Sequence, residues 1–139
     1  MLFRSGLFRD GDRYPKEYER VANEVYAPYY LRFMKKVPRE LQNLNIAFDV
    51  YRQLWGEAGE FRVTGEIRDW DAFRRLHRIR VPTLVLAGRY DQATPESALR
   101  IAGRIPQGEC LIFERSGHFP FIDQRKLFLA AIEDFLTGT

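Results

Sequence analysis

One acid and one histidine are the residues of this chain whose types and positions best suit chemistry. Asp91 lies in the stretch VPTLVLAGRYDQATPE, shortly after an apolar run, and His118 follows a second apolar run in ERSGHFP. A carboxylate that accepts a hydrogen bond from one imidazole nitrogen fixes the tautomer of the ring. It also stabilises the imidazolium that forms when the other nitrogen takes a proton. Together the two side chains could be the acid and the base of a hydrolytic triad.

Each residue alone also has a simpler interpretation. Asp91 could end a turn or cap a helix, and His118 could be a loop histidine beside a glycine. We favour the chemical interpretation because both residues follow runs that are typical of strands in a parallel sheet. In such sheets, ligands and catalytic groups gather at the carboxyl ends of the strands. If the two strands are neighbours, the acid and the histidine emerge at the same edge.

The two strands are predicted at 83–88 and 109–114. The first run, TLVLAG, is continuously apolar and bounded by a proline and a glycine, which is typical of a parallel strand covered on both faces. A helix begins at Pro95 behind a threonine cap, and residues 121–136 contain a final helix with Leu136 on its inner side. The order strand, helix, strand, helix predicts a right-handed parallel crossover unit.

The first part of the chain is predicted to be helical. Residues 14 to about 56 contain two sets of apolar residues at helical spacing, one after Pro15 and one after Pro38. We expect them to form a helical hairpin. The second helix would end at Gly56, where a left-handed conformation costs little because glycine has no Cβ.

The stretch that joins the two parts, residues 57–80, is predicted to be an ordered connector. It contains turn-like breaks and a short helical candidate at 71–77. The simplest interpretation of its acids is that Asp69 or Asp71 caps this helix while Trp70 packs, and we prefer it to a catalytic role for the pair.

Composition excludes several classes of function. The 139 residues suit one domain, 45% of them are hydrophobic, and the net charge of +3 is spread along the chain without a basic tract for nucleic acid. The single cysteine, Cys110, excludes an intramolecular disulfide and a cysteine cluster for zinc. His77 and His118 are the only histidines, so we expect no metal site, and we also expect no cofactor.

The N-terminal stretch suits neither a signal peptide nor a membrane span. A cytoplasmic location with no membrane partner is expected.

Residues from about 14 to 139 resemble the C-terminal half of an α/β-hydrolase of the proline iminopeptidase group. VYRQLWGEAGEFRVTGEIRDWD, VPTLVLAGRYDQATP and SGH are similar to that group's return from cap to core, its acid-bearing strand and its histidine loop. The order acid then histidine also matches the chain order Ser, Asp, His of this fold. The resemblance implies an α/β fold that is a partial α/β-hydrolase, with a helical cap portion at 1–80 and the end of the core at 81–139.

The resemblance also implies roles for individual residues. Asp91 would be the triad acid, His118 the general base, and Glu60 a contact for the free amino terminus of a small peptide-like substrate. Glu60 could equally be a solvated charge. Gln92 holds the place of a second acid of the group, and a neutral amide there should weaken recognition of a cationic amine. Proline iminopeptidase-like hydrolysis of an N-terminal peptide bond, or of a small ester or amide, is the expected activity.

A nucleophile is missing from this chain. The motif G-x-S-x-G is absent, none of Ser5, Ser97 and Ser116 suits a strained strand-to-helix turn, and Cys110 in a buried strand should be an inert thiol with a raised pKa. We therefore expect the chain alone to be inactive. Its apolar strands would recruit either the N-terminal half of a hydrolase as a separate chain or a second copy. The alternative is a catalytically inactive protein that acts as an interaction or self-associating module.

Overall fold

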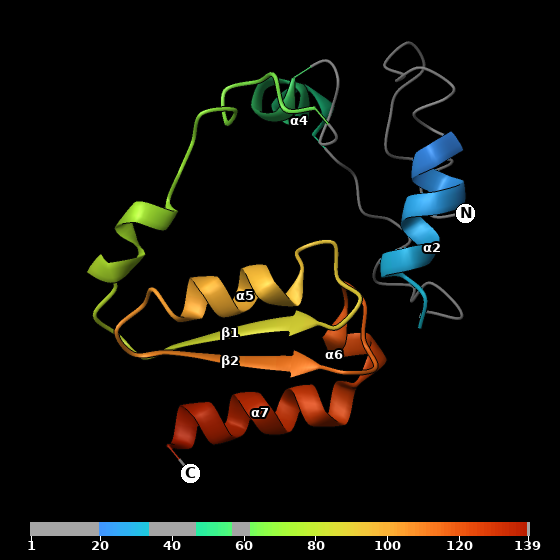
Figure 1. Cartoon of the computed structure of the whole chain (residues 1–139). Coiled ribbons are helices and arrows are strands. Elements are labelled where there is room, and N and C mark those ends of the chain that lie inside the picture. Colours follow the sequence, from blue (N-terminus) through green and yellow to red (C-terminus); the bar gives the residue numbers. More distant parts are fainter. Residues whose placement is uncertain (1–19, 34–46, 57–61, 139) are drawn as a thin grey trace. The chain divides into compact units, whose positions relative to one another are not determined.

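The computed structural model describes residues 20–33, 47–56 and 62–138 of the chain (Figure 1). The chain divides into two compact units, one of residues 1–26 and 36–71 and the other of residues 27–35 and 72–139. Whether residues 1–80 correspond to a cap and 81–139 to a core stays a prediction. No helix within these described ranges is long and apolar enough to cross a membrane.

The second unit is built on two parallel strands, β1 (Thr83–Gly88) and β2 (Gly108–Phe113), joined by helix α5 (Pro95–Ala102). The limits of β1 are those predicted, and β2 lies one residue earlier than predicted. α5 begins at Pro95 behind Thr94, whose Oγ1 accepts a hydrogen bond from the N–H of Ser97. The strand, helix, strand order of the sequence therefore forms the expected crossover, with both strands ending at the same edge.

The C-terminal part of this unit contains two helices. α6 spans Pro120–Asp123 and α7 spans Arg125–Thr137, so residues 121–136, predicted to contain one final helix, cover parts of both. The break lies at Gln124, whose backbone leaves the helical region with φ −131° and ψ 48°. Its Oε1 accepts a hydrogen bond from the N–H of Arg115 at 2.7 Å. The helix expected from the apolar pattern is thus divided at a residue whose side chain bonds to the loop after β2.

The core of this unit is small. Phe113 is fully buried, and its ring centroid lies 6.0 Å from that of Phe128 in α7. Most of β1 and β2 is only half-buried, although their apolar runs predict strands covered on both faces. Leu136, predicted on an inner face, is 77% exposed. The described residues form a sheet of two strands, with α5 and α7 on opposite sides of the pair (Figure 1). Much of the apolar surface of this sheet therefore stays accessible.

In the first unit, α4 spans Phe48–Trp55 and ends at Gly56. Gly56 has the expected positive φ, 90°, but its ψ of −178° is extended and not left-handed helical. A Cβ at this position would lie 2.1 Å from Oγ1 of Thr64, because the chain folds back against the end of the helix. Pro38, the predicted start of this helix, lies outside the described residues.

The first predicted helix is described from residue 20 onward. A π-helix, η1 (Ala22–Tyr26), runs directly into α2 (Ala27–Tyr30), and the predicted start at Pro15 lies outside the described residues. Ala27 and Tyr30 of α2 are both buried, and α2 belongs to the second unit. A short helix from the N-terminal part of the chain therefore belongs to the same compact unit as β1 and β2.

The connector contains a 3-10 helix, η3 (Phe73–Arg78). Its N-cap residue is Ala72, which makes no side-chain cap, so neither Asp69 nor Asp71 occupies the predicted N-cap position. Asp69 forms an exposed ion pair with the preceding arginine instead. Trp70 is 67% exposed, so the prediction that it packs is also wrong. The Asp69 carboxylate is therefore paired with its chain neighbour.

Candidate active site

Asp91 lies in the turn that follows β1, as predicted. Its backbone N–H donates to the carbonyl of Gly88 at 3.2 Å, and its Oδ1 accepts a hydrogen bond from the N–H of Ala93 at 2.9 Å. An aspartate that accepts from the backbone two residues later is a common stabiliser of turns. Asp91 is only 8% exposed. Its own turn therefore orients the carboxylate, and the carboxylate is largely shielded from solvent.

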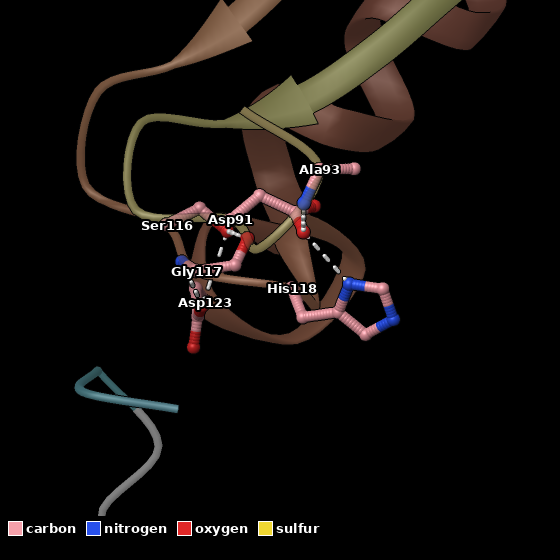
Figure 2. Close-up of polar contacts among 6 residues, drawn as sticks. All are labelled: Asp91, Ala93, Ser116, Gly117, His118 and Asp123. Atoms are coloured by element: carbon pink, nitrogen blue, oxygen red, sulfur yellow. Dashed lines mark hydrogen bonds and ion pairs between the residues drawn. The ribbon is translucent and has the colours of Figure 1, made fainter. Parts of the chain in front are cut away.

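His118 lies in the loop that follows β2, and its side chain meets that of Asp91 (Figure 2). Nδ1 of His118 is 2.9 Å from Oδ1 of Asp91. An ionised carboxylate has no proton to give, so Nδ1 is the donor and the ring is the Nδ1–H tautomer. The histidine side chain is 39% exposed against 9% for the aspartate. Nε2 is turned away from Asp91 (Figure 2), so a ring held in this way can accept a proton there.

The parallel register explains why the two loops meet. Gly88, the last residue of β1, is the partner of Phe113, the last residue of β2. The pairing continues beyond the strands, because the N–H of Arg89 donates to the carbonyl of Phe113 at 2.9 Å. The N–H of Tyr90 then donates to the carbonyl of Ser116 at 3.0 Å. The turn that contains Asp91, here called the acid turn, and the loop 116–118, here called the histidine loop, are thus joined by backbone hydrogen bonds.

Two glycines allow this close approach. A Cβ on Gly88 would lie 2.0 Å from the carbonyl oxygen of Gly117, and a Cβ on Gly117 would lie 1.7 Å from the carbonyl oxygen of Tyr30. The same Tyr30 oxygen accepts a hydrogen bond from the N–H of His118 at 2.9 Å. All the obstructing atoms are backbone, so a side-chain rotation cannot make room. The position of the histidine loop depends on both glycines.

Aromatic rings surround the pair. The ring of His118 makes edge contacts with Phe119, at 4.9 Å between centroids, and with Tyr30, at 5.9 Å. On the acid turn, the guanidinium of Arg32 lies 4.1 Å from the ring centroid of Tyr90. Edge-to-face aromatic contacts and cation–π contacts of this kind are favourable. α2 and the residues after it therefore contact the acid turn as well as the histidine loop.

An ion pair spans the two strand ends on the solvent side. Arg89, which follows β1, forms a bidentate pair with Glu114, which follows β2, and its Nε lies 2.8 Å from one carboxylate oxygen. Hydrogen bonding to Arg89 holds the pKa of Glu114 below its usual range, and the same bond raises the pKa of Arg89. The side chains are 42% and 65% exposed, so solvent screens the pair and its contribution to stability is small.

The two predicted substrate contacts, Glu60 and Gln92, both stay predictions. Gln92 is exposed and directly follows Asp91 in the chain. Glu60 lies outside the described residues, and its contact with a substrate amine stays a prediction. Within the described ranges, no group of three or more histidine, cysteine or acidic side chains could hold a metal ion.

Neither described serine is placed as a nucleophile. Ser116 is fully buried, with its hydroxyl 3.1 Å from a carboxylate oxygen of Asp123, and the hydroxyl of Ser97 is 3.3 Å from that of Thr94 at the start of α5. Ser5 lies outside the described residues. Partial burial raises the pKa of the Cys110 thiol, as predicted, which disfavours the reactive thiolate.

Two residues of this site were not identified from the sequence. Asp123 contacts the histidine loop from α6, and its place shortly after His118, in a turn that begins with Pro120, is a signal that could have identified it. Tyr30 contributes mainly a backbone carbonyl. A carbonyl is present in every residue, so no sequence pattern could have indicated this contact.

Known proteins are similar to this chain in sequence and in fold. A sequence profile of the alpha/beta hydrolase fold matches residues 9–124. The chain is 33% identical over 120 residues to the proline iminopeptidase of Heyndrickxia coagulans, covering 84% of this chain and 41% of that protein. It is 30% identical over 128 residues to the proline iminopeptidase of Saccharolobus solfataricus, covering 91% and 41%. The chain thus spans about two fifths of the length of these relatives.

Solved structures agree with the sequence comparison. The crystal structure of the proline iminopeptidase of Mycobacterium smegmatis superposes with a TM-score of 0.71 and 26% identity, covering 88% of this chain and 42% of that one. The crystal structure of VinJ gives a TM-score of 0.72 and 28% identity, covering 89% and 43%.

Proposed function

Because this chain belongs to the α/β-hydrolase fold family, we propose that it supplies the acid and the base of a serine-hydrolase triad, Asp91 and His118. The observation that carries the proposal is the 2.9 Å contact between Nδ1 of His118 and Oδ1 of Asp91 at the ends of paired parallel strands. An acid that orients the base at this edge of the sheet is the arrangement that serine hydrolysis requires.

In the proposed reaction His118 acts through Nε2. It takes the proton of a serine hydroxyl while the serine oxygen bonds to the carbonyl carbon of the substrate, and it gives that proton to the leaving amine or alcohol. Water then attacks the acyl-enzyme. His118 takes the proton of the water and returns it to the serine oxygen as the acid product leaves. Asp91 keeps Nδ1–H in place and stabilises the imidazolium without taking a proton itself.

The serine must come from another segment. The 139 residues contain no G-x-S-x-G stretch, and Ser116, the serine nearest to His118 in sequence, is fully buried. We propose that a chain with this motif and the oxyanion donors completes the sheet beside β1 and β2. Support comes from the half-buried strands and from exposed apolar residues such as Leu136. On this proposal the chain alone has no hydrolase activity.

The proposed substrate is an N-terminal peptide bond or a small ester or amide, acted on in the cytoplasm. Its support is the similarity to proteins named proline iminopeptidase. Glu60 is the proposed contact for the substrate amine. Gln92, next to Asp91, offers a hydrogen bond but no charge, and charge-assisted hydrogen bonds are roughly twice as strong as neutral ones. A cationic amine should therefore be bound more weakly than in a site with two acids.

Co-expression with the part of the Heyndrickxia coagulans proline iminopeptidase that precedes the matched region tests this proposal. Native mass spectrometry reports which chains assemble, and hydrolysis of a prolyl aminocoumarin and of p-nitrophenyl acetate reports turnover. We expect activity only in the two-chain particle. Asp91→Asn should lower kcat by about 10⁴-fold and His118→Ala by about 10⁶-fold, without changing assembly.

The matched control is Asp134→Asn, which changes an exposed carboxylate on α7 and should leave kcat as it is. Full turnover by the Asp91→Asn particle would refute the assignment of the acid. A homo-oligomer of this chain that does not assemble with the second chain would instead favour an interaction module without chemistry.

A further inference from the structure

We propose that Asp123 is the positioning residue of the general base, because its carboxylate holds the loop 116–118 where His118 can meet Asp91. The inference rests on the proposed function of Asp91 and His118. Asp123 touches neither of these side chains. It acts through the backbone and the serine hydroxyl that precede the histidine.

One carboxylate oxygen makes both contacts. Oδ2 of Asp123 accepts a hydrogen bond from the N–H of Gly117 at 3.0 Å and lies 3.1 Å from the hydroxyl of Ser116 (Figure 2). The serine hydroxyl is also 3.1 Å from the carbonyl of Gly117, so its single proton is shared between two acceptors. Ser116 and Gly117 are both buried. Without Asp123, the buried N–H of Gly117 would lose this acceptor.

Local structure places the carboxylate. α6 begins at Pro120, and the N–H of Asp123 donates to the carbonyl of Phe119 at 2.9 Å. The backbone of Asp123 is therefore bonded to the residue that follows the histidine, while its side chain is bonded to residues that precede it. The segment from 116 to 123 closes on itself around His118. This closure determines from which direction the imidazole approaches Asp91.

Other contacts restrain the same loop, and Asp123 adds to them. The carbonyl of Ser116 accepts from the N–H of Tyr90, and the N–H of His118 donates to the carbonyl of Tyr30. The N–H of Ser116 also donates to the carbonyl of Phe113 at 3.2 Å. None of these bonds involves the N–H of Gly117. That N–H lies in the same planar peptide unit as the carbonyl of Ser116. Asp123 and Tyr90 therefore hold opposite sides of this peptide, one residue before His118.

The second oxygen of Asp123 explains which substitution should preserve the function. Oδ1 is buried and has no hydrogen-bond partner among the described residues. A buried polar atom without a partner is unfavourable, so the benefit of this side chain lies in Oδ2. An amide oxygen can accept the same two bonds. We therefore expect Asp123→Asn to keep the loop in place and Asp123→Ala to release it.

Nitrogen-15 NMR of the full chain labelled at histidine tests the inference at a pH where the ring is neutral. The ring nitrogens of His118 should report the Nδ1–H tautomer in the native chain and in Asp123→Asn. In Asp123→Ala that tautomer should be lost in favour of Nε2–H, the form that an imidazole prefers in water. The exposed His77 is an internal reference, and Asp134→Ala is the control variant. If the alanine variant does not fold, Asp123→Ser, whose hydroxyl is too short to accept both donors, gives the same comparison.

The outcomes separate this inference from the proposed function. If Asp123→Ala or Asp123→Ser melts at a lower temperature but His118 keeps Nδ1–H, Asp123 is only structural and the inference is overturned. If Asp123→Asn loses the tautomer as completely as alanine does, one acceptor oxygen is not enough and the inference is also overturned. If the native chain itself lacks Nδ1–H while it is folded, the pairing of Asp91 with His118 fails, and the proposed function fails with it.

Discussion

Gly117→Ala should separate α2 from the histidine loop. A Cβ on residue 117 would lie 1.7 Å from the carbonyl oxygen of Tyr30 and 2.6 Å from its carbonyl carbon. Ordinary van der Waals contact begins at 3.4 Å, twice the first of these separations. Both atoms are backbone, so the two segments must move apart. The adjacent bond from the N–H of His118 to the Tyr30 oxygen, now 2.9 Å, would then be stretched beyond hydrogen-bonding distance.

The expected cost follows from the contacts that are lost. Leaving a buried donor without its partner costs about 1–3 kcal/mol. Loss of the edge contact between Tyr30 and His118 adds about 0.5–1.5 kcal/mol. The free energy of unfolding should therefore fall by about 1.5–4.5 kcal/mol. In an active two-chain particle, a shift of the base by about 1 Å should also lower kcat by about 10²-fold.

Urea denaturation followed by circular dichroism measures the change, with Gly103→Ala as the matched control. Gly103 has a φ of −65°, and a Cβ there would lie 3.3 Å from the carbonyl oxygen of Leu99, a contact that a small adjustment relieves. The control should stay within about 1 kcal/mol of the native chain. Equal stabilities of the two variants would show that the contact between Tyr30 and residue 117 does not form in solution.

Two further predictions follow from the shifted pKa values. Burial raises the pKa of Cys110, so at about pH 8.5 the folded chain should react with iodoacetamide more slowly than the urea-unfolded chain, and equal rates would contradict the burial of this thiol. The pKa of Glu114 is lowered by Arg89, so the stability that this pair contributes is present above the unfolded pKa of about 4.3 and is lost as pH falls through the folded pKa. Glu114→Gln should remove this part of the acid dependence of the urea midpoint, and parallel profiles for the two chains below that pH would show that the pair does not form.

The strands and the helix between them could be predicted because local signals decide them. The limits of β1 (Thr83–Gly88) follow from a continuous apolar run between a proline and a glycine. α5 begins where a threonine cap precedes Pro95, and both signals act within one turn of the helix. The positions of Asp91 and His118 at strand ends followed directly from these limits.

Predictions that depended on packing were less successful. Trp70 and Leu136 were placed on packed faces by their apolar character, but both are largely exposed. Periodicity shows which residues could be covered, and it does not show what covers them. The described part of the chain provides two strands, so the remaining apolar surface has no cover within it.

The sequence by itself determined the order of strand, acid, helix, strand and histidine, and it showed that a nucleophile motif is absent from these residues. Only the tertiary structure decided that Oδ1 of Asp91 meets Nδ1 of His118, that residue 117 has no room for a Cβ, and that Asp123 accepts a hydrogen bond from the N–H of Gly117. The reason is physical. Strands and caps depend on neighbours along the chain, whereas these contacts depend on which backbone groups and side chains meet at a distance of a few ångströms.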